Sequence, residues 1–360
     1  MESNLYTKYE KNEIIQLFTE LLAIPSPSGM ENNIANHIFK KCTEWGYNSK
    51  KDYAGNVYVQ IPGQKDSEET CCLAAHIDEI GLMVTKVNPD GTLEVERVGG
   101  TLTWKFGERP VEIFGENKTI KGITAMGSGH ATGKSPSNLE WKDVQIITGL
   151  PPEKLKSYGI KPGTLIVPAQ SVRGPILFGE ETDPMIAAWT FDDKMGVVAL
   201  LRLLKTIKTQ NVTPIVTLII AFTTSEEIGC FGAKHLAQSL HPTYFIAVDG
   251  CPFASVSPME LDSRPGIRIR DGSYFYDRGL IKALSEAATM AGTELQPLVY
   301  TISGSDAGMV GNIGASPQTA CLGHIRKNSH GFEIAHLSVF ENLYKVLWTF
   351  VTSWEGSLKP

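Results

Sequence analysis

A single stretch decides the fold, Ile215-Val-Thr-Leu-Ile-Ile-Ala-Phe-Thr-Thr-Ser-Glu-Glu-Ile-Gly229, in which an apolar run ends on two adjacent carboxylates. The run is rich in β-branched residues and carries no charge, which is typical of a strand covered on both faces. Gly229 and the following residues 232–236 indicate a turn into a helix. Because ligands and catalytic groups gather at the carboxyl ends of strands in open α/β sheets, Glu226 and Glu227 are predicted to be the chemical centre.

The same stretch has a plainer interpretation. Ser225 would be the N-cap of the next helix, and Glu226 and Glu227 would complement the dipole of that helix. Taken alone, the stretch favours neither interpretation. The rest of the chain has to decide between them.

The composition is that of an ordinary globular protein, and it argues against nucleic-acid and membrane partners. With 360 residues, 42% hydrophobic and 20% charged, the chain is long enough for one large domain and a smaller one. A net charge of -6, with no cluster of Lys and Arg, argues against a nucleic-acid partner. Residues 1–20 lack the basic start and apolar core of a signal peptide, and no apolar segment is long enough to span a bilayer, so no membrane partner is expected.

The cysteines bear on the compartment. Six of them are scattered along the chain: Cys42, Cys71, Cys72, Cys230, Cys251 and Cys321. None has the C-x-x-C spacing of zinc fingers or thioredoxin-like redox motifs. Scattered cysteines in a long chain suggest reduced thiols, and the protein is expected to be cytoplasmic.

Helical and extended patterns alternate in the first 81 residues. Apolar residues at helical spacing predict helices over 14–22 and 34–45. A turn and strand over 52–60 and a strand over 70–75 follow, which gives a βα alternation.

The strand over 70–75 leads directly into His76-Ile-Asp-Glu-Ile-Gly81. In extended backbone His76 and Asp78 point the same way at the strand end. A metal-binding histidine usually donates its other ring N–H to a carboxylate, and Asp78 is placed to be that partner. A core histidine satisfied by a nearby carboxylate is the competing interpretation.

The pattern changes between about residues 82 and 167, where short alternating strands are separated by glycine-rich turns. We interpret this segment as an inserted all-β module. Its loop 127–133 lacks the strand-to-helix context of a phosphate-binding loop, and His130 within it is most simply a loop histidine. The predicted elements of the module are strands over 93–97, 111–114, 119–124 and 143–147 and one short helix over 152–158.

After the module, acids again follow buried segments. A strand over 186–191 runs into Asp192, ahead of an amphipathic helix over 197–207. A buried strand over 243–248 ends on Asp249. Acids at a helix start are also common as dipole complements, which is the other interpretation of Asp192. The remaining predictions are a helix over 279–290, a strand over 298–302, a loop over 303–308, a strand over 317–322 and a closing helix over 337–354.

Five strand-end or loop positions offer metal ligands: His76, Asp192, Glu227, Asp249 and His330. Imidazole and carboxylate without thiolate suit zinc, cobalt or manganese. Five protein ligands exceed what one catalytic zinc requires, but they serve two metals if one carboxylate bridges. Glu226, the remaining carboxylate, would then be the general base that takes a proton from water and returns it to the leaving amine.

In this order the motifs resemble the M42 glutamyl and deblocking aminopeptidases, including the tetrahedral (TET) aminopeptidases. The resemblance runs nearly from end to end and rests on Leu21-Leu-Ala-Ile-Pro-Ser-Pro-Ser-Gly29, Ala54-Gly-Asn56, Ala75-His-Ile-Asp-Glu-Ile-Gly81, Phe191-Asp-Asp-Lys-Met-Gly196, Ser225-Glu-Glu-Ile-Gly229 and His330. The chain departs from the family pattern at Lys194, where arginine is usual, and around His330, where His-Ser-Pro is usual. The second departure leaves His324 and His336 as other candidates for the last ligand.

The resemblance implies roles for these residues. It assigns two divalent metal ions, zinc or cobalt with manganese as a third choice, to His76 and Asp249 for one ion and Glu227 and His330 for the other, with Asp192 bridging. It makes Glu226 the general base and Asp78 the residue that orients His76. It also implies a cis peptide bond between Asp192 and Asp193.

The resemblance further implies an architecture. A three-layer α/β/α catalytic domain would comprise residues 1–81 and 168–360, with an inserted small all-β, PDZ-like dimerisation domain over 82–167. The insert lies within the 116 positions between His76 and Asp192, whereas relatives of the M20 type carry their extra domain later. In similar enzymes the insert mediates assembly, so a homo-oligomer built from dimers, up to a dodecamer, is expected.

The predicted function is therefore that of a metal-dependent aminopeptidase, a hydrolase that releases N-terminal amino acids from short peptides. Two alternatives remain. A related dinuclear-metal amidohydrolase or deacylase would turn over N-acylated substrates, and a catalytically silent assembly protein would keep the fold alone.

Overall fold

A large mixed sheet carries the predicted metal-ligand segments. The computed structural model describes residues 12–64, 69–128, 139–253 and 255–356. The sheet has eight strands in the order β1 (Lys50–Lys51), β2 (Val57–Ile61), β12 (Thr217–Thr223), β3 (Thr70–His76), β13 (Tyr244–Val248), β17 (Gln318–Gly323), β15 (Gly266–Arg270) and β16 (Gln296–Val299). Strands β12, β3, β13 and β17 run parallel to one another at its centre.

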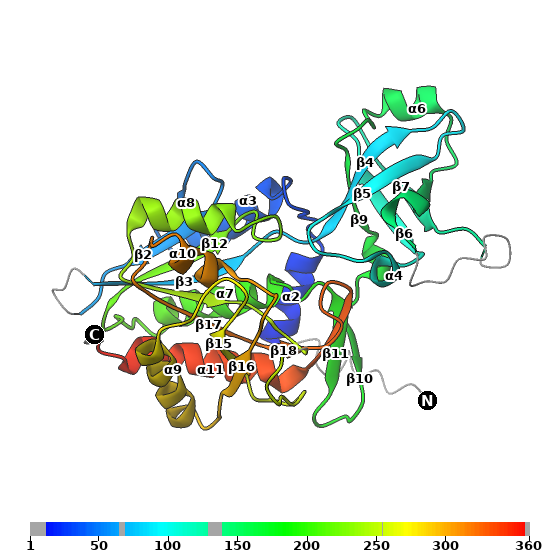
Figure 1. Cartoon of the computed structure of the whole chain (residues 1–360). Coiled ribbons are helices and arrows are strands. Elements are labelled where there is room, and N and C mark those ends of the chain that lie inside the picture. The colour runs from blue at the N-terminus through cyan, green and yellow to red at the C-terminus, as the bar shows by residue number, and fades with distance from the viewer. Residues whose placement is uncertain (1–11, 65–68, 129–138, 254, 357–360) are drawn as a thin grey trace.

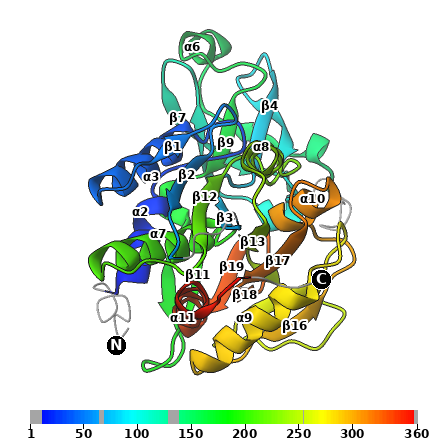
Figure 2. The ribbon, with the colours of Figure 1, turned by 90° about the vertical axis from the view of Figure 1, so that its left-hand side faces the viewer.

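Helices cover both faces of this sheet, as Figures 1 and 2 show. One face packs on α2 (Glu13–Leu22), α7 (Lys194–Thr209), α9 (Arg278–Met290) and α11 (Leu337–Ser353), with α3 (Asn32–Glu44) joining the same core. The other face packs on α8 (Phe231–Leu240) and α10 (Asp306–Asn312). In β12 Leu218 and Ile220 enter the first core, and Ile219 and Ala221 enter the second. Burial on both faces explains the uninterrupted apolar run, and the predicted mixed α/β class is confirmed.

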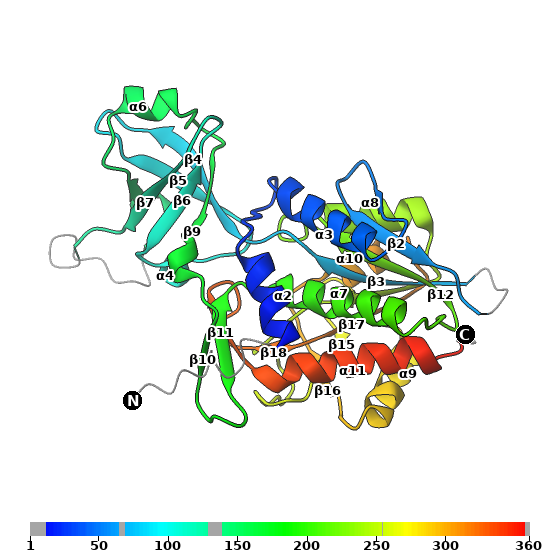
Figure 3. The same cartoon turned by 180° about the vertical axis from the view of Figure 1, so that it is seen from behind.

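The second unit is a closed six-stranded barrel that stands beside the sheet (Figures 1 and 3). Its strands are β4 (Gly81–Val87), β5 (Leu93–Val98), β8 (Gln145–Ile147), β7 (Thr119–Ala125), β6 (Pro110–Phe114) and β9 (Leu165–Pro168), with α4 (Thr103–Phe106), α6 (Pro152–Ser157) and a 3-10 turn, η2 (Trp141–Asp143). The PDZ-like character and the domain bounds stay predictions. His130 lies outside the described residues.

Two small sheets complete the strands of the described structure. One contains β10 (Ile176–Phe178), β11 (Met185–Trp189) and β19 (Phe332–His336), and the other contains β14 (Cys251–Pro252) and β18 (Ile325–Arg326); a 3-10 turn, η3 (Gln170–Val172), precedes β10. The predicted strand over 186–191 is thus β11. It lies in the small antiparallel sheet and does not extend the parallel one, because it pairs with β10 and β19.

One local prediction was wrong, and one alternative interpretation is excluded. The loop predicted over 303–308 contains the start of α10, where the Ser305 hydroxyl accepts a hydrogen bond from the Gly308 amide at 3.2 Å. The two glycines of this segment, Gly304 and Gly308, favoured a loop because glycine has low helix propensity. The capping interpretation of Ser225 also fails, because Ser225 has a φ of 57° and α8 begins only at Phe231.

Within the described ranges, no helix combines the length and the apolar composition needed to cross a membrane.

The central strand should dominate stability. Ile220 is fully buried in β12, whereas Ile302 is 94% exposed. Ile220→Ala should lower the free energy of unfolding by about 2–5 kcal/mol, because it leaves a cavity between sheet and helices. Ile302→Ala should change it by less than about 0.5 kcal/mol. Urea denaturation of both variants checks this, and equal losses would contradict the predicted packing.

Candidate active site

The turn between β12 and α8 presents the two glutamates, and Asp78 holds it in place. One oxygen of Asp78, Oδ1, accepts a hydrogen bond from the Glu226 amide at 3.0 Å. The other, Oδ2, accepts from the Glu227 amide at 3.2 Å and from the Ser28 hydroxyl at 2.6 Å. Asp78 is fully buried, so these donors compensate the burial of its charge. Asp78 therefore fixes the backbone of both glutamates.

Asn56, from the Ala-Gly-Asn motif, binds the residues at which this turn begins and ends. Asn56 Oδ1 accepts from the Thr224 amide at 2.9 Å, and its Nδ2 donates to the Gly232 carbonyl at 2.9 Å. A Cβ at Gly232 would lie 2.4 Å from Asn56 Oδ1 and from the Thr224 carbonyl oxygen. Glycine is therefore required where the turn enters α8.

His76, the last residue of β3, has a defined orientation. Its Nδ1 lies 3.1 Å from the main-chain carbonyl of Asp78 and 3.5 Å from the Asp78 carboxylate. Because a carbonyl only accepts, Nδ1 donates to it, and Nε2 is the ring atom that faces the neighbouring carboxylates. Nε2 faces Asp192 Oδ1 at 3.1 Å. Both the main chain and the side chain of Asp78 thus lie beside the imidazole, and the main-chain contact is the shorter one.

Asp192 lies at the centre of the site. The Asp192–Asp193 peptide bond is cis, as the resemblance implied. While Oδ1 faces His76, Oδ2 lies 3.4 Å from His330 Nε2 and forms a close ion pair with Arg326. Although burial opposes it, the Arg326 guanidinium, together with the two histidines, holds the pKa of Asp192 well below its usual range.

The predicted ligands form two triads that share Asp192. His76, Asp192 and Asp249 offer ligand atoms that all lie within 4.8 Å of one another, and so do Asp192, Glu227 and His330. These are the two sets that the resemblance implied. Which of them bind metal stays a prediction.

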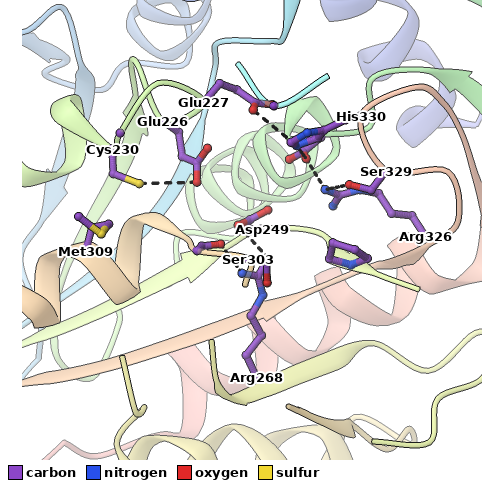
Figure 4. A pocket seen from close by; sticks show the side chains of 15 residues that line it. Glu226, Glu227, Cys230, Asp249, Arg268, Ser303, Met309, Arg326, Ser329 and His330 are labelled. Carbon is purple, nitrogen blue, oxygen red and sulfur yellow. Dashed lines mark hydrogen bonds and ion pairs between the residues drawn. The ribbon is translucent and has the colours of Figure 1, made fainter. Parts of the chain in front are cut away.

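His330 is the histidine that reaches this cluster. Its Nε2 lies 3.5 Å from Glu227 Oε2, and the two are joined in Figure 4. His324 is buried against Phe191 and Phe340. His336 pairs with Asp183 at 3.1 Å. The structure therefore brings only His330, of the three candidates, to Glu227.

Two buried arginines, neither of which was predicted from the sequence, complete the cluster. Arg268, on β15, donates from Nη2 to Asp249 Oδ2 at 3.1 Å. Arg326, on β18, pairs with Asp192 and donates from Nε to Glu333 Oε1 at 2.9 Å. The available signal was weak: Arg268 lies between two isoleucines in Gly266-Ile-Arg-Ile, and Arg326 follows the apolar strand that ends at Gly323. Such a residue requires an acidic partner when it is buried.

A pocket of about 340 Å³ opens in front of these residues. Glu226, Glu227, Asp249, Arg268, Arg326 and His330 line it together with Cys230, Ser303 and Met309 (Figure 4). Glu226 Oε2 lies 4.0 Å from His76 Nε2. Burial, and next the carboxylates of Asp249 and Glu227, raise the pKa of Glu226 well above its usual value. The pocket therefore contains a carboxyl group that holds a proton readily.

The donor set fits a divalent cation. Each triad contains one imidazole and two carboxylates, a combination that suits zinc, cobalt or manganese. Glu227 Oε1 is buried and has no hydrogen-bond donor among the described residues. Burial raises the pKa of Glu227 to about 7, against the opposing influence of His330. A cation would compensate this acceptor and favour the charged carboxylates.

The chain has sequence relatives among the aminopeptidases. The glutamyl aminopeptidase of Lactococcus lactis is 26% identical over 360 aligned residues, which cover 95% of this chain and 96% of the relative. The lysyl aminopeptidase of Pyrococcus furiosus is 23% identical and covers 65% of each chain.

Solved structures share the fold. The TET1 peptidase of Pyrococcus horikoshii, described as assembling into a tetrahedron or a large octahedral shell, has a TM-score of 0.82 and 27% identity and covers 94% of this chain and 99% of its own. A TET aminopeptidase from a Thaumarchaeota archaeon has a TM-score of 0.85 at 20% identity, covers 96% and 98%, and supports the fold alone. Since the model of the M42 glutamyl aminopeptidase family matches residues 55–346, the chain belongs to this family of peptide hydrolases.

Proposed function

We propose that the protein is a metal-dependent aminopeptidase that releases N-terminal amino acids from short peptides. The observation that carries the proposal is the shared position of Asp192. Its two oxygens face the histidines of two different triads, at 3.1 Å for His76 and 3.4 Å for His330. A carboxylate with one oxygen toward each triad is suited to bridge two ions.

The ligands of the two ions are proposed as follows: His76 and Asp249 for one, Glu227 and His330 for the other, and Asp192 for both. When bound, zinc or cobalt ions, with manganese as the third choice, would supply the positive charge that activates water and polarises the scissile carbonyl.

Glu226 is the proposed general base. It comes from the same turn as Glu227 but belongs to neither triad, and it lines the pocket. Its raised pKa suits a group that takes a proton from water and returns it to the leaving amine. Asp78 supports it by holding the Glu226 amide at 3.0 Å, and it also orients His76.

The barrel is the proposed assembly domain, over residues 82–167 and PDZ-like. Several apolar side chains of this unit are exposed, among them Leu102, Trp104, Ile123 and Ile147, which are 44–57% exposed. Ile123 and Ile147 lie opposite each other on paired strands, and adjoining exposed apolar side chains are typical of a contact between subunits. With the relatives that form closed shells, this supports a homo-oligomer built from dimers, up to a dodecamer. All six cysteines are free and buried, which is compatible with the cytoplasmic location that we also propose.

Metal-restored hydrolysis tests the function. The protein is stripped of metal, restored with zinc, cobalt or manganese, and assayed on aminoacyl anilides with free or acylated amines. We expect hydrolysis only by the protein to which metal has been restored, and only of the anilides whose amine is free. Hydrolysis of the N-acylated anilides alone would indicate a deacylase. A folded protein that hydrolyses none of the anilides with any metal would favour an assembly protein.

The general base is tested by Glu226→Gln. The variant should keep its fold and its metal while kcat falls at least about 100-fold, because the amide cannot accept the proton of water. Glu286→Gln, at a largely exposed position on α9, is the matched control and should retain full turnover. Near-normal kcat in Glu226→Gln would contradict the assignment.

The bridge is tested by Asp192→Ala. Removing a ligand common to both sets should release metal during dialysis, which elemental analysis measures. Asp90→Ala, in the exposed turn after β4, is the control and should keep the metal content of the wild type. An Asp192→Ala protein that stays fully metallated would argue against a bridging role.

A further inference from the structure

A third group of possible metal ligands includes the proposed base. Glu226, Cys230 and Asp306 offer ligand atoms that all lie within 4.8 Å of one another. Cys230 Sγ lies 3.6 Å from Glu226 Oε1, the contact drawn in Figure 4. Among the described residues, Cys230 is the only cysteine that belongs to such a group.

One carboxylate oxygen of Asp306 lacks an N–H or O–H donor among the described residues, although the Cys230 thiol interacts with this carboxyl group. Asp306 is 3% exposed at the start of α10. Its Oδ2 accepts from the Thr223 hydroxyl at 2.5 Å, whereas Oδ1 is buried and has no hydrogen-bond partner in the described structure. Native structures rarely leave a buried carboxylate oxygen unsatisfied, so this atom requires an explanation such as an ion.

We propose that Glu226, Cys230 and Asp306 form a third metal site, which takes a thiophilic divalent ion such as Zn²⁺ or Cd²⁺, and that filling it inhibits the enzyme. The inhibition rests on the proposed function of Glu226 as the base, because a carboxylate that binds an ion no longer accepts the proton of water. The binding itself does not depend on that role.

The geometry suits a small tetrahedral ion. Zinc lies about 2.3 Å from a thiolate sulfur and about 2.0–2.2 Å from a carboxylate oxygen, which places these two ligand atoms about 3.5 Å apart. The observed separation of Cys230 Sγ and Glu226 Oε1 is 3.6 Å. Glu226 and Cys230 line the pocket, so an ion could reach them from it and take water as a further ligand.

The ligand atoms of this third group differ from those of the two triads. Those contain nitrogen and oxygen donors only, whereas Cys230 adds sulfur, which favours zinc and cadmium over manganese and magnesium. Burial, and next the charge of Glu226, raise the pKa of the Cys230 thiol, so without an ion the thiol is protonated. Binding would release that proton to solvent, and the ion would compensate both carboxylates.

Cobalt absorption tests the site directly. A thiolate bound to Co²⁺ gives a charge-transfer band in the near ultraviolet, which the sulfur-free triads cannot produce. Cobalt added to the full-length protein beyond two equivalents should produce this band in the wild type and in Cys42→Ala, whose thiol is buried on α3. Cys230→Ala should lack it. Absence of the band from the wild type, or its persistence in Cys230→Ala, would overturn the site.

Zinc inhibition tests the consequence. With each rate normalised to the maximum of the same variant, excess zinc should inhibit the wild type and Cys42→Ala alike. Loss of one ligand should raise the half-inhibiting zinc concentration at least about 10-fold in Cys230→Ala and in Asp306→Asn. An unchanged midpoint in both variants would overturn the inhibitory role. A wild type without peptidase activity at any zinc level would instead contradict the proposed function, while the cobalt band would still report the site.

Discussion

The electrostatic repulsion among buried carboxylates is the constraint on which the site depends. Asp192, Glu227, Asp249, Asp306 and Glu333 share one small volume with Glu226, and burial raises the pKa of most of them. Such a cluster is stable only when cations or donors compensate it. The protein supplies two guanidinium groups, from Arg268 and Arg326, and two imidazoles. Among the described residues, buried carboxylate oxygens without a hydrogen-bond donor remain on Glu227, Asp306 and the neighbouring Asp193, and a cation or a proton would compensate them.

Backbone geometry brings these acids together in spite of their repulsion. The parallel register pairs Thr223 of β12 with His76 of β3, so the Glu226–Glu227 turn and the 76–79 segment emerge at the same level. Asp78 then bonds both glutamate amides, which ties the two strand ends to each other. Ser225 and Cys230 flank the turn with φ of 57° and 55°, an unfavourable conformation for residues with a Cβ. The hydrogen bonds of Asp78 and Asn56 compensate this strain. They fix the turn that presents Glu226 and Glu227, two side chains with different proposed roles.

The sequence predicted the parts of this arrangement that rest on local pattern. Apolar runs identified β3, β12 and β13, and the rule that strand ends carry chemistry identified the acids that follow them. The pairing of strands distant in sequence could not be predicted. Strand β11 has the composition of a central strand, but it pairs with β10 and β19, and hydrophobic periodicity does not reveal which strands pair. The buried arginines were missed for the same reason, because Arg268 and Arg326 are explained only by acids distant in sequence.

Glu333 shows how an unusual loop still delivers its histidine. The segment around His330 lacks the His-Ser-Pro of the family pattern, and His330 has a φ of 61°. Glu333 Oε1 accepts from the His330 amide at 3.2 Å and from Arg326 Nε at 2.9 Å, while Oε2 accepts from the Asp192 amide at 3.1 Å. One fully buried carboxylate thus holds the His330 backbone, the arginine that neutralises Asp192, and the Asp192 backbone. The position of His330 therefore depends on this clamp, which keeps the imidazole facing Glu227.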